Sequence, residues 1–437
     1  MTSTRTVIMG AAGKDFHVFN TLFRGRDEVH VVAFTATQIP GIAGRKYPAA
    51  LAGPGYPHGI PIYAEDELPS LIEAERITRV VFAYSDVSHD HVMDRAASVV
   101  ARGATFELPS AAQLMLPSTV PVISVCAVRT GCGKSQTSRK IAGILHGMGK
   151  RVVVVRHPMP YGDLVKQRVQ RFATYDDLLA HDCTIEEREE YEPHLAEGAI
   201  VMAGVDYQAI LAEAEKSADV IIWDGGNNDT PFFAPTLEIV VADPHRAGHE
   251  LTYYPGSVNI RRAGVVIINK VDTAAEADVA LVEANVRRVN PKAVIIRAAS
   301  PVTVENGAAL AGKRVLVVED GPTVTHGGMS FGAGVVAART LGASEIVDPR
   351  PCAVGSLVDV FQKYSQVRAV LPAMGYGKAQ VADLEATIRR CDCDAVIVAT
   401  PIDLARLITV DKPMHRVQYS LEELSGPTLE ELLRTVL

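Results

Sequence analysis

Short runs of valine and isoleucine alternate with amphipathic stretches along the whole of this sequence. Such runs are typical of parallel strands buried on both faces of a sheet, with the amphipathic stretches as crossover helices. The alternation excludes all-α and all-β folds and predicts an α/β protein built on parallel sheets. The strand-like runs lie at 7–9, 29–34, 80–84, 121–125, 152–155, 220–223, 238–242, 264–268, 293–297, 315–318, 368–371 and 395–399.

The chain is long enough for more than one hydrophobic core. Its 437 residues, 48% of them hydrophobic, exceed the roughly 100–200 residues of one typical domain. We divide it into a Rossmann-like N-terminal domain over 1–118, a P-loop nucleotide-binding domain over 119–300, and a C-terminal α/β domain over 301–437 that contributes to the substrate site. No repeat or low-complexity linker separates these parts, so we expect them to pack closely.

Charge and cysteine content narrow the class of partner. The net charge of −8 is mild and no long run of like charges occurs, so neither a nucleic-acid surface nor a basic membrane patch is indicated. The six cysteines lack disulfide-scaffold density, and no run reaches about 18 apolar residues. We therefore expect a cytoplasmic protein with reduced thiols and a small, nucleotide-sized substrate.

A phosphate-binding loop follows the strand at 121–125. The residues Arg129, Thr130, Gly131, Cys132, Gly133, Lys134, Ser135 and Gln136 form this loop and the start of the next helix. Such a loop needs glycines for close approach, backbone N–H groups for phosphate oxygens, a lysine for the β/γ-phosphates and a serine for magnesium. Val128 stands where the general motif has its first glycine, so the loop resembles the tighter Thr-Gly-x-Gly-Lys-Thr form of dethiobiotin synthetases and Mur ligases.

Two further motifs stand at strand ends downstream. Asp224 ends the run 220–223 and is followed by two glycines, which suits a carboxylate beside magnesium at the carboxyl edge of a sheet. Asn269, Lys270 and Asp272 follow the run 264–268 and match the Asn-Lys-x-Asp motif with which GTPases read guanine. Trp223 is expected to be core packing.

Candidates for the substrate site lie on other loops and in an acidic segment. Arg156 and His157 follow the strand at 152–155, while His326 and Lys378 lie in glycine-rich stretches of the C-terminal part. The glycine-rich turn at 326–334 precedes a small-residue helix and could form an anion-binding nest or a tight packing turn. The segment 183–194 reads mostly as a solvated helix face, but Glu186 and Glu187 are candidate metal ligands and Arg188 a candidate substrate group.

Taken together, these stretches resemble the cyclic 2,3-diphosphoglycerate synthetase family over nearly the whole chain. The matching stretches are 127–137, 183–194, 224–229, 269–272, 319–327 and 400–404. The resemblance implies a dimer that uses ATP and Mg²⁺ to close 2,3-diphosphoglycerate into its cyclic pyrophosphate, releasing ADP and phosphate. It also implies that Lys134, Arg129 and a magnesium ion on Ser135 neutralise charge on the nucleotide, while Arg156, His157 and His326 hold the substrate. From the residues themselves, Asp224 is a further catalytic and metal candidate and Glu187 a further metal candidate.

Other functions stay open at this point. The Asn-Lys-x-Asp run favours guanine whereas the resemblance implies ATP, so GTP is the alternative nucleotide. A regulatory or metallochaperone-type GTPase, or a kinase or ligase acting on another small phosphorylated or carboxylated acid, would carry the same loop. Gly10 to Gly13 after the first strand is a weak signal for a dinucleotide or coenzyme A, because it lacks the full G-x-G-x-x-G pattern.

Overall fold

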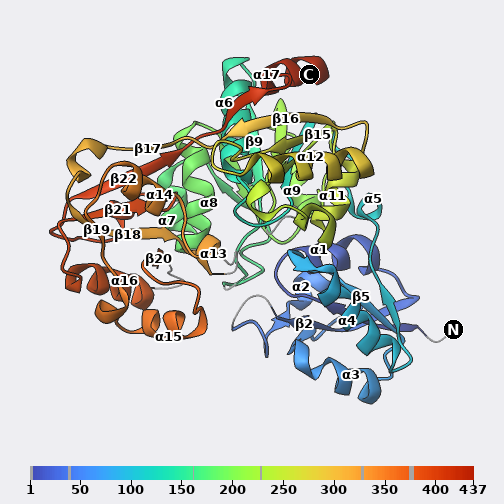
Figure 1. Ribbon diagram of the computed structural model, residues 1–437. Helices are drawn as coiled ribbons and strands as arrows, with labels where there is room; N and C mark the ends of the chain where they lie inside the picture. Colours follow the sequence, from blue (N-terminus) through green and yellow to red (C-terminus); the bar gives the residue numbers. More distant parts are fainter. Residues whose placement is uncertain (1–2, 38–40, 161, 227–228, 326–328, 374–377) are drawn as a thin grey trace.

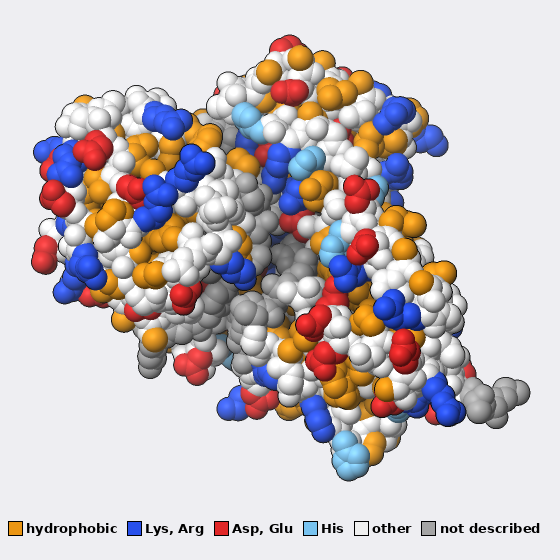
Figure 2. Space-filling view, turned by 60° about the horizontal axis from the view of Figure 1, so that its bottom comes forward, with side chains coloured by type: hydrophobic (Ala, Val, Ile, Leu, Met, Phe, Trp, Pro, Cys, Tyr) orange, Lys and Arg blue, Asp and Glu red, His pale blue; other side chains and the backbone are white. Residues whose placement is uncertain are grey.

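Three sheets organise the protein. A computed structural model describes residues 3–37, 41–160, 162–226, 229–325, 329–373 and 378–437. The N-terminal domain lies below the central domain, and the C-terminal domain lies to the left of both (Figure 1). The surface is hollowed where the left-hand lobe, the C-terminal domain, meets the rest of the molecule (Figure 2). The predicted α/β class with parallel sheets is confirmed.

The N-terminal sheet has the strand order β3-β4-β2-β1-β5-β7, and only β3 runs antiparallel to its neighbour. Val7 and Met9 of β1 pack into one core cluster and Ile8 into another, so the sheet is buried on both faces. Its strands are β1 (Thr4–Met9), β2 (Val29–Ala36), β3 (Lys46–Tyr47), β4 (Ile60–Ala64), β5 (Arg79–Phe82) and β7 (Thr105–Glu107). Its helices are α1 (Lys14–Val18), α2 (Ala49–Ala52), α3 (Leu68–Ala74), α4 (His89–Val100) and α5 (Ala111–Leu114).

The central sheet has nine strands in the order β10-β11-β9-β12-β8-β13-β15-β16-β23, and only the two edge strands are antiparallel. These strands are β8 (Val122–Ala127), β9 (Val152–Arg156), β10 (Gln170–Phe172), β11 (Ile200–Ala203), β12 (Val220–Trp223), β13 (Leu237–Ala242), β15 (Val265–Ile268), β16 (Val294–Ala299) and β23 (Glu422–Ser425). The helices are α6 (Lys134–Gly147), α7 (Tyr175–Ala180), α8 (Ile185–Ala196), α9 (Tyr207–Ala214), α10 (His249–Thr252), α11 (Gly256–Arg262), α12 (Glu276–Val289) and α17 (Leu429–Val436).

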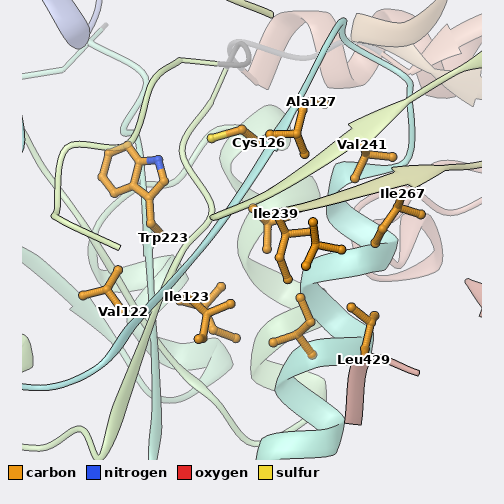
Figure 3. Packing of buried hydrophobic residues seen from close by; sticks show 14 of the residues in the cluster. Val122, Ile123, Cys126, Ala127, Trp223, Ile239, Val241, Ile267 and Leu429 are labelled. Atoms are coloured by element: carbon orange, nitrogen blue, oxygen red, sulfur yellow. The ribbon is translucent and has the colours of Figure 1, made fainter. Parts of the chain in front are cut away.

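The core of this domain surrounds β8, all six residues of which are buried. Figure 3 shows Ile123 and Cys126 of β8 among side chains of the neighbouring strands, including Trp223. Trp223 is fully buried, as expected. Because β8, β9, β12, β13 and β15 are parallel, the loops after them meet at one edge of the sheet.

The C-terminal sheet is smaller, with the order β17-β22-β21-β18-β19 and with β20 also paired to β18. Its strands are β17 (Val302–Val304), β18 (Arg314–Asp320), β19 (Glu345–Ile346), β20 (Leu371–Ala373), β21 (Ala395–Ala399) and β22 (Met414–Tyr419). Its helices are α13 (Gly321–Val324), α14 (Ala333–Thr340), α15 (Ser356–Lys363) and α16 (Lys378–Arg390). A short ribbon of β6 (Val87–Ser88) and β14 (Tyr253–Tyr254) joins the N-terminal and central domains.

The end of the chain returns to the central domain, which the sequence did not indicate. β23 pairs with β16, and Leu429 and Leu433 of α17 lie in the central core. The last strand and helix of the segment 301–437, which we expected to form the C-terminal domain, therefore belong to the central domain. In Figure 1 this red segment lies beside α6 and β16.

We predict that Leu433→Ala lowers the free energy of unfolding by about 2–5 kcal/mol, because it opens a cavity in the central core. Leu433 is 0% exposed, whereas Leu424 of the adjoining strand β23 is 53% exposed. Leu424→Ala is therefore the matched control and should change stability little. Urea unfolding of both variants tests the packing of α17, and equal stability of the two would contradict it.

Candidate functional site

The phosphate-binding loop connects β8 to α6 in the order that the sequence predicts. Gly131 and Gly133 have positive φ angles of 83° and 114°, and α6 begins at Lys134. Among the described residues, no side-chain acceptor occupies the backbone N–H groups of Gly131, Gly133, Lys134 or Ser135. Free amides at a helix N-terminus form an anion-binding site, so this loop is open to phosphate.

Asp224 is the centre of a buried ion network at this edge. Its side chain is fully buried and is bonded by Lys134 (Nζ to Oδ1, 2.5 Å), by the guanidinium of Arg156, and by His194 (Nε2 to Oδ2, 3.1 Å). Burial alone would raise the pKa of Asp224, but the charges of Arg156 and Lys134 hold that pKa well below its usual value. Asp224 is therefore a carboxylate that places the loop lysine.

Arg156 is committed to this network. It is 1% exposed and pairs with Glu190 at 2.6 Å as well as with Asp224. His157 is bonded to the hydroxyl of Tyr207 and, through Nε2, to Asp229 at 2.9 Å. The two predicted substrate groups thus lie beside the phosphate loop, but Arg156 has both of its partners inside the protein.

Arg129 ties the loop to the N-terminal domain. Its Nε donates to Asp86 Oδ1 at 2.5 Å, and its guanidinium lies 3.9 Å from the ring centroid of Tyr253. Asp86 also accepts hydrogen bonds from the backbone N–H and the hydroxyl of Thr130. In this arrangement the predicted catalytic arginine pairs with a carboxylate that the sequence analysis did not single out.

The Asn-Lys-x-Asp run packs against the phosphate loop. Asn269 Nδ2 donates to the carbonyl of Cys132 at 2.9 Å, and Lys270 Nζ donates to the carbonyl of Gly131 at 2.6 Å. Asp272 is exposed, and its Oδ1 accepts the backbone N–H of Ser300 at 3.1 Å. Ser300 also donates its hydroxyl to Gln136 at 3.2 Å. An exposed, fixed carboxylate beside the loop can accept hydrogen bonds from a nucleotide base.

Asp243 is a member of this site that sequence reasoning missed. It follows β13, is buried, and pairs with Lys270 at 2.9 Å and Arg246 at 3.2 Å. Burial would raise its pKa, but these two cations lower it below the usual value. The sequence pattern that could have identified Asp243 is the one that identified Asp224, an apolar strand followed directly by an aspartate.

The acidic helix α8 corrects an expectation, because it is buried and not solvated. Glu186, Glu187, Arg188, Glu189 and Glu192 are each less than 9% exposed. The hydroxyl of Thr400 donates to Glu189 at 2.5 Å, so the helix contacts the C-terminal domain. Burial raises the pKa of Glu187, and it raises that of Glu189 well above the usual value with help from Asp320.

Glu187, the predicted metal ligand, and Arg188, the predicted substrate group, are both bonded to neighbouring groups of the protein. Glu187 accepts the backbone N–H of Met159 at 2.8 Å and that of Thr184 at 2.9 Å, so it caps the start of α8. Arg188 pairs with Glu192 one turn later, at 2.9 Å. Among the residues that the structure describes, no three His, Cys, Asp or Glu side chains gather as a metal site. A magnesium ion at Ser135 and Asp224 would take most of its ligands from phosphate and water.

Three backbone amides at the start of α14 are bonded to a carboxylate of the protein itself. The carboxylate of Glu319 accepts the backbone N–H groups of Gly332 (3.0 Å), Gly334 (3.3 Å) and Val335 (3.0 Å). Burial raises the pKa of Glu319 to about 7 against these hydrogen bonds. The amides of Gly332 and Gly334, which the sequence offered to a second phosphate, are therefore bonded within the protein. His326 and the side chain of Lys378 lie outside the described residues.

The glycine-rich turn at Gly10–Gly13, the weak dinucleotide signal of the N-terminal domain, also has amides that are bonded to a carboxylate of the protein. The carboxylate of Asp15 accepts the backbone N–H groups of Ala12 and Gly13 at 2.8–3.1 Å. Burial raises the pKa of Asp15 to about 6, while these amide contacts lower it. A dinucleotide pyrophosphate would have to displace this carboxylate, so the geometry does not favour a dinucleotide here.

A strand, an amide-lined loop, a following helix and the lysine–aspartate pair together define a P-loop nucleotide-binding protein of the α/β class. The chain is 59% identical to the arginine synthetase ArcE of Thermococcus kodakarensis, over 98% of this chain and 96% of that protein. It belongs to the arginine synthetase ArcE family. This family name is not cyclic 2,3-diphosphoglycerate synthetase, the family that the sequence motifs resemble. No family model matches the sequence.

Solved structures with similar folds include two nucleotide complexes. LpxK from Aquifex aeolicus, in an apo form in complex with ATP, is 14% identical, covers 84% of this chain and 98% of its own, and has a TM-score of 0.44. Cobyrinic acid a,c-diamide synthase from Mycobacterium smegmatis, with an ATP analogue and magnesium, is 19% identical, covers 41% and 72%, and has a TM-score of 0.18. None of the described helices is long and apolar enough to cross a membrane.

We predict that Gly133→Ala abolishes binding of ATP with Mg²⁺. Gly133 has a φ of 114°, and a Cβ there would collide with the side-chain nitrogen of Asn269. At Gly143 of helix α6 a Cβ would meet no atom within 4 Å, so Gly143→Ala is the control and should bind normally. Calorimetric titration measures the ATP affinity of both variants. An unchanged affinity in Gly133→Ala would show that the nucleotide binds elsewhere.

Asp272→Ala should lower GTP affinity by about tenfold and change ATP affinity less, since guanine offers this carboxylate two adjacent donors. Asp278→Ala removes an exposed acid from the following helix and serves as the control. Competitive displacement of a fluorescent nucleotide measures both affinities. Unchanged GTP affinity would show that Asp272 does not contact the base and only bonds the amide of Ser300.

Proposed function

We propose that this protein is an ATP-dependent synthetase that forms the guanidinium group of arginine. The observation that carries the proposal is the 59% identity to an arginine synthetase across nearly the whole of both chains. The open phosphate loop supports it, because a synthetase couples bond formation to a nucleotide. Lys134, held beside the loop by Asp224, is placed to exchange this carboxylate for a β/γ-phosphate.

The chemistry of the product indicates the acceptor. A guanidinium group differs from a ureido group by one nitrogen in place of oxygen, so the direct precursor of arginine by amination is citrulline. The ureido oxygen attacks the γ-phosphorus of ATP and the bond to ADP breaks, which leaves an O-phosphorylated isourea. Ammonia then adds to the carbon, loses its extra protons to solvent, and expels inorganic phosphate.

The residues of this chain would divide that work by position. The amides of Gly131 to Ser135 hold the phosphates, and Lys134 neutralises charge on the transferred group. Ser135 and Asp224 supply the oxygens that a nucleotide-bound magnesium prefers, and the ion would stabilise charge on the phosphates. Arg156 stays paired with Asp224 and Glu190, so its role is to hold Asp224 in place.

Closure of 2,3-diphosphoglycerate into its cyclic pyrophosphate is the second candidate, favoured by the motif resemblance at 129–135, 224–229 and 319–327. It would use the same nucleotide loop. Two arginines that could receive its phosphates, Arg156 and Arg188, are already paired with carboxylates. For this reason we rank it below arginine formation.

The proposal predicts that the wild-type protein with ATP, Mg²⁺, citrulline and ammonium yields arginine, ADP and phosphate in equal amounts. Citrulline labelled with ¹⁸O in its ureido group should transfer the label to inorganic phosphate, which ³¹P NMR detects. Lys134→Ala should lose at least about a hundredfold in rate, because the lysine stabilises the transferred phosphoryl group. Lys216→Ala, at an exposed lysine of the same domain, is the control.

Parallel reactions with 2,3-diphosphoglycerate separate the candidates. A cyclic product without arginine formation would replace the first candidate by the second. Nucleotide hydrolysis that neither acceptor changes would reject both and favour the regulatory GTPase class.

A further inference from the structure

A second pocket lies between the N-terminal and central domains, next to the nucleotide loop but not part of it. The turn from Gly10 to Asp15 lines one side, and His157, Gly226 and Asp229 line the other. The volume of this pocket is about 60 Å³. A single water molecule requires roughly 10–15 Å³ of such cavity volume. The pocket therefore has room for roughly four to six atoms of the size of a water molecule.

Two opposite charges in this pocket are buried and incompletely satisfied. Lys14 and Asp229 are each 4% exposed, and their closest charged atoms, Nζ and Oδ1, lie 3.8 Å apart. Neither of these atoms has a hydrogen-bond partner among the described residues. Lys14 also lies 5.0 Å from the ring centroid of Tyr254. Buried charged atoms without hydrogen bonds are costly, so their presence in a pocket points to a ligand.

The side chains of Asp15 and His157 in this pocket are already bonded. Asp15 accepts the amides of Ala12 and Gly13, and His157 is bonded to Tyr207 and to the other oxygen of Asp229. The unsatisfied set is thus one ammonium donor beside one carboxylate acceptor. A phosphate would satisfy Lys14 but would be repelled by Asp229, while a simple amine would satisfy Asp229 and be repelled by Lys14.

A zwitterion matches both groups at once. We propose that this pocket binds the α-amino-acid head of the acceptor substrate, with Lys14 bonding its carboxylate and Asp229 its ammonium group. The head has five non-hydrogen atoms, which fits the volume of the pocket. The proposal rests on the proposed function only for the identity of the far end of the ligand.

The pocket is joined to the nucleotide site through Glu190. This glutamate lines the pocket and pairs with Arg156, which in turn pairs with Asp224. A side chain that extends from the bound head past Glu190 therefore approaches the carboxylate that holds Lys134. The N-terminal domain, whose glycine-rich turn has its amides bonded to Asp15, would then select the amino-acid end of the substrate.

The test compares L-arginine with two analogues by calorimetric titration of the full-length protein. Agmatine lacks the carboxylate and 5-guanidinopentanoic acid lacks the α-amino group, so each should bind wild type about ten- to a hundredfold more weakly than arginine. Lys14→Met should abolish the preference for arginine over agmatine. Asp229→Asn should abolish the preference over 5-guanidinopentanoic acid. Lys216→Met is the matched control and should keep both preferences.

Circular dichroism and ATP affinity show whether each variant is folded, and the two variants test the pocket independently. Equal binding of arginine and agmatine by wild type, or an undiminished preference for arginine in folded Lys14→Met and Asp229→Asn, would overturn the proposal. If wild type makes no arginine but shows Lys14-dependent selectivity for amino acids, the pocket stands and the proposed reaction falls. If it makes arginine and both variants keep their selectivity, the reaction stands and the pocket falls.

Discussion

The buried carboxylate of Asp224 is the interaction on which the arrangement of the site depends. It binds a lysine from the start of α6, an arginine from the end of β9 and a histidine from α8. Removing a charge from the centre of such a network leaves its partners buried without compensation, which is strongly destabilising. Through α8 the network reaches the C-terminal domain, and through the phosphate loop it reaches Asp86 of the N-terminal domain. All three domains are therefore tied to one carboxylate.

The three glycine-rich turns of this protein show how a fold can keep or close an anion site. Each turn precedes a helix, and each presents backbone N–H groups at the start of that helix. In two of them the chain supplies its own anion: Asp15 of α1 bonds the turn before that helix, and Glu319 of β18 bonds the turn before α14. In the phosphate loop Asp86 accepts the N–H of Thr130, but among the described residues no side chain accepts the N–H groups of Gly131, Gly133, Lys134 or Ser135. The open turn is the one that needs a ligand.

The features predicted from sequence are those that local pattern determines. The phosphate loop, the helix after it and Asp224 follow from strand ends and glycine spacing, and the packing of Asn269 and Lys270 on the loop fits their motif. The burial of α8 could not be predicted in this way, because its glutamates look solvated until Thr400, 211 residues from Glu189, is brought against them. The pairing of Lys14 with Asp229 likewise joins the start of α1 in the N-terminal domain to a loop of the central domain.

The return of the C-terminus to the central domain has a consequence for synthesis on the ribosome. Lys140 of α6, the helix that begins with the phosphate loop, bonds Glu423 of β23 and the carbonyl of Leu421, while α17 packs into the central core. The nucleotide domain therefore lacks an edge strand and part of its core until residues 422–436 have been translated and have left the exit tunnel. A product that terminates before residue 422 leaves uncovered the apolar core surface on which Leu429 and Leu433 pack, and chaperones and proteases recognise such surface.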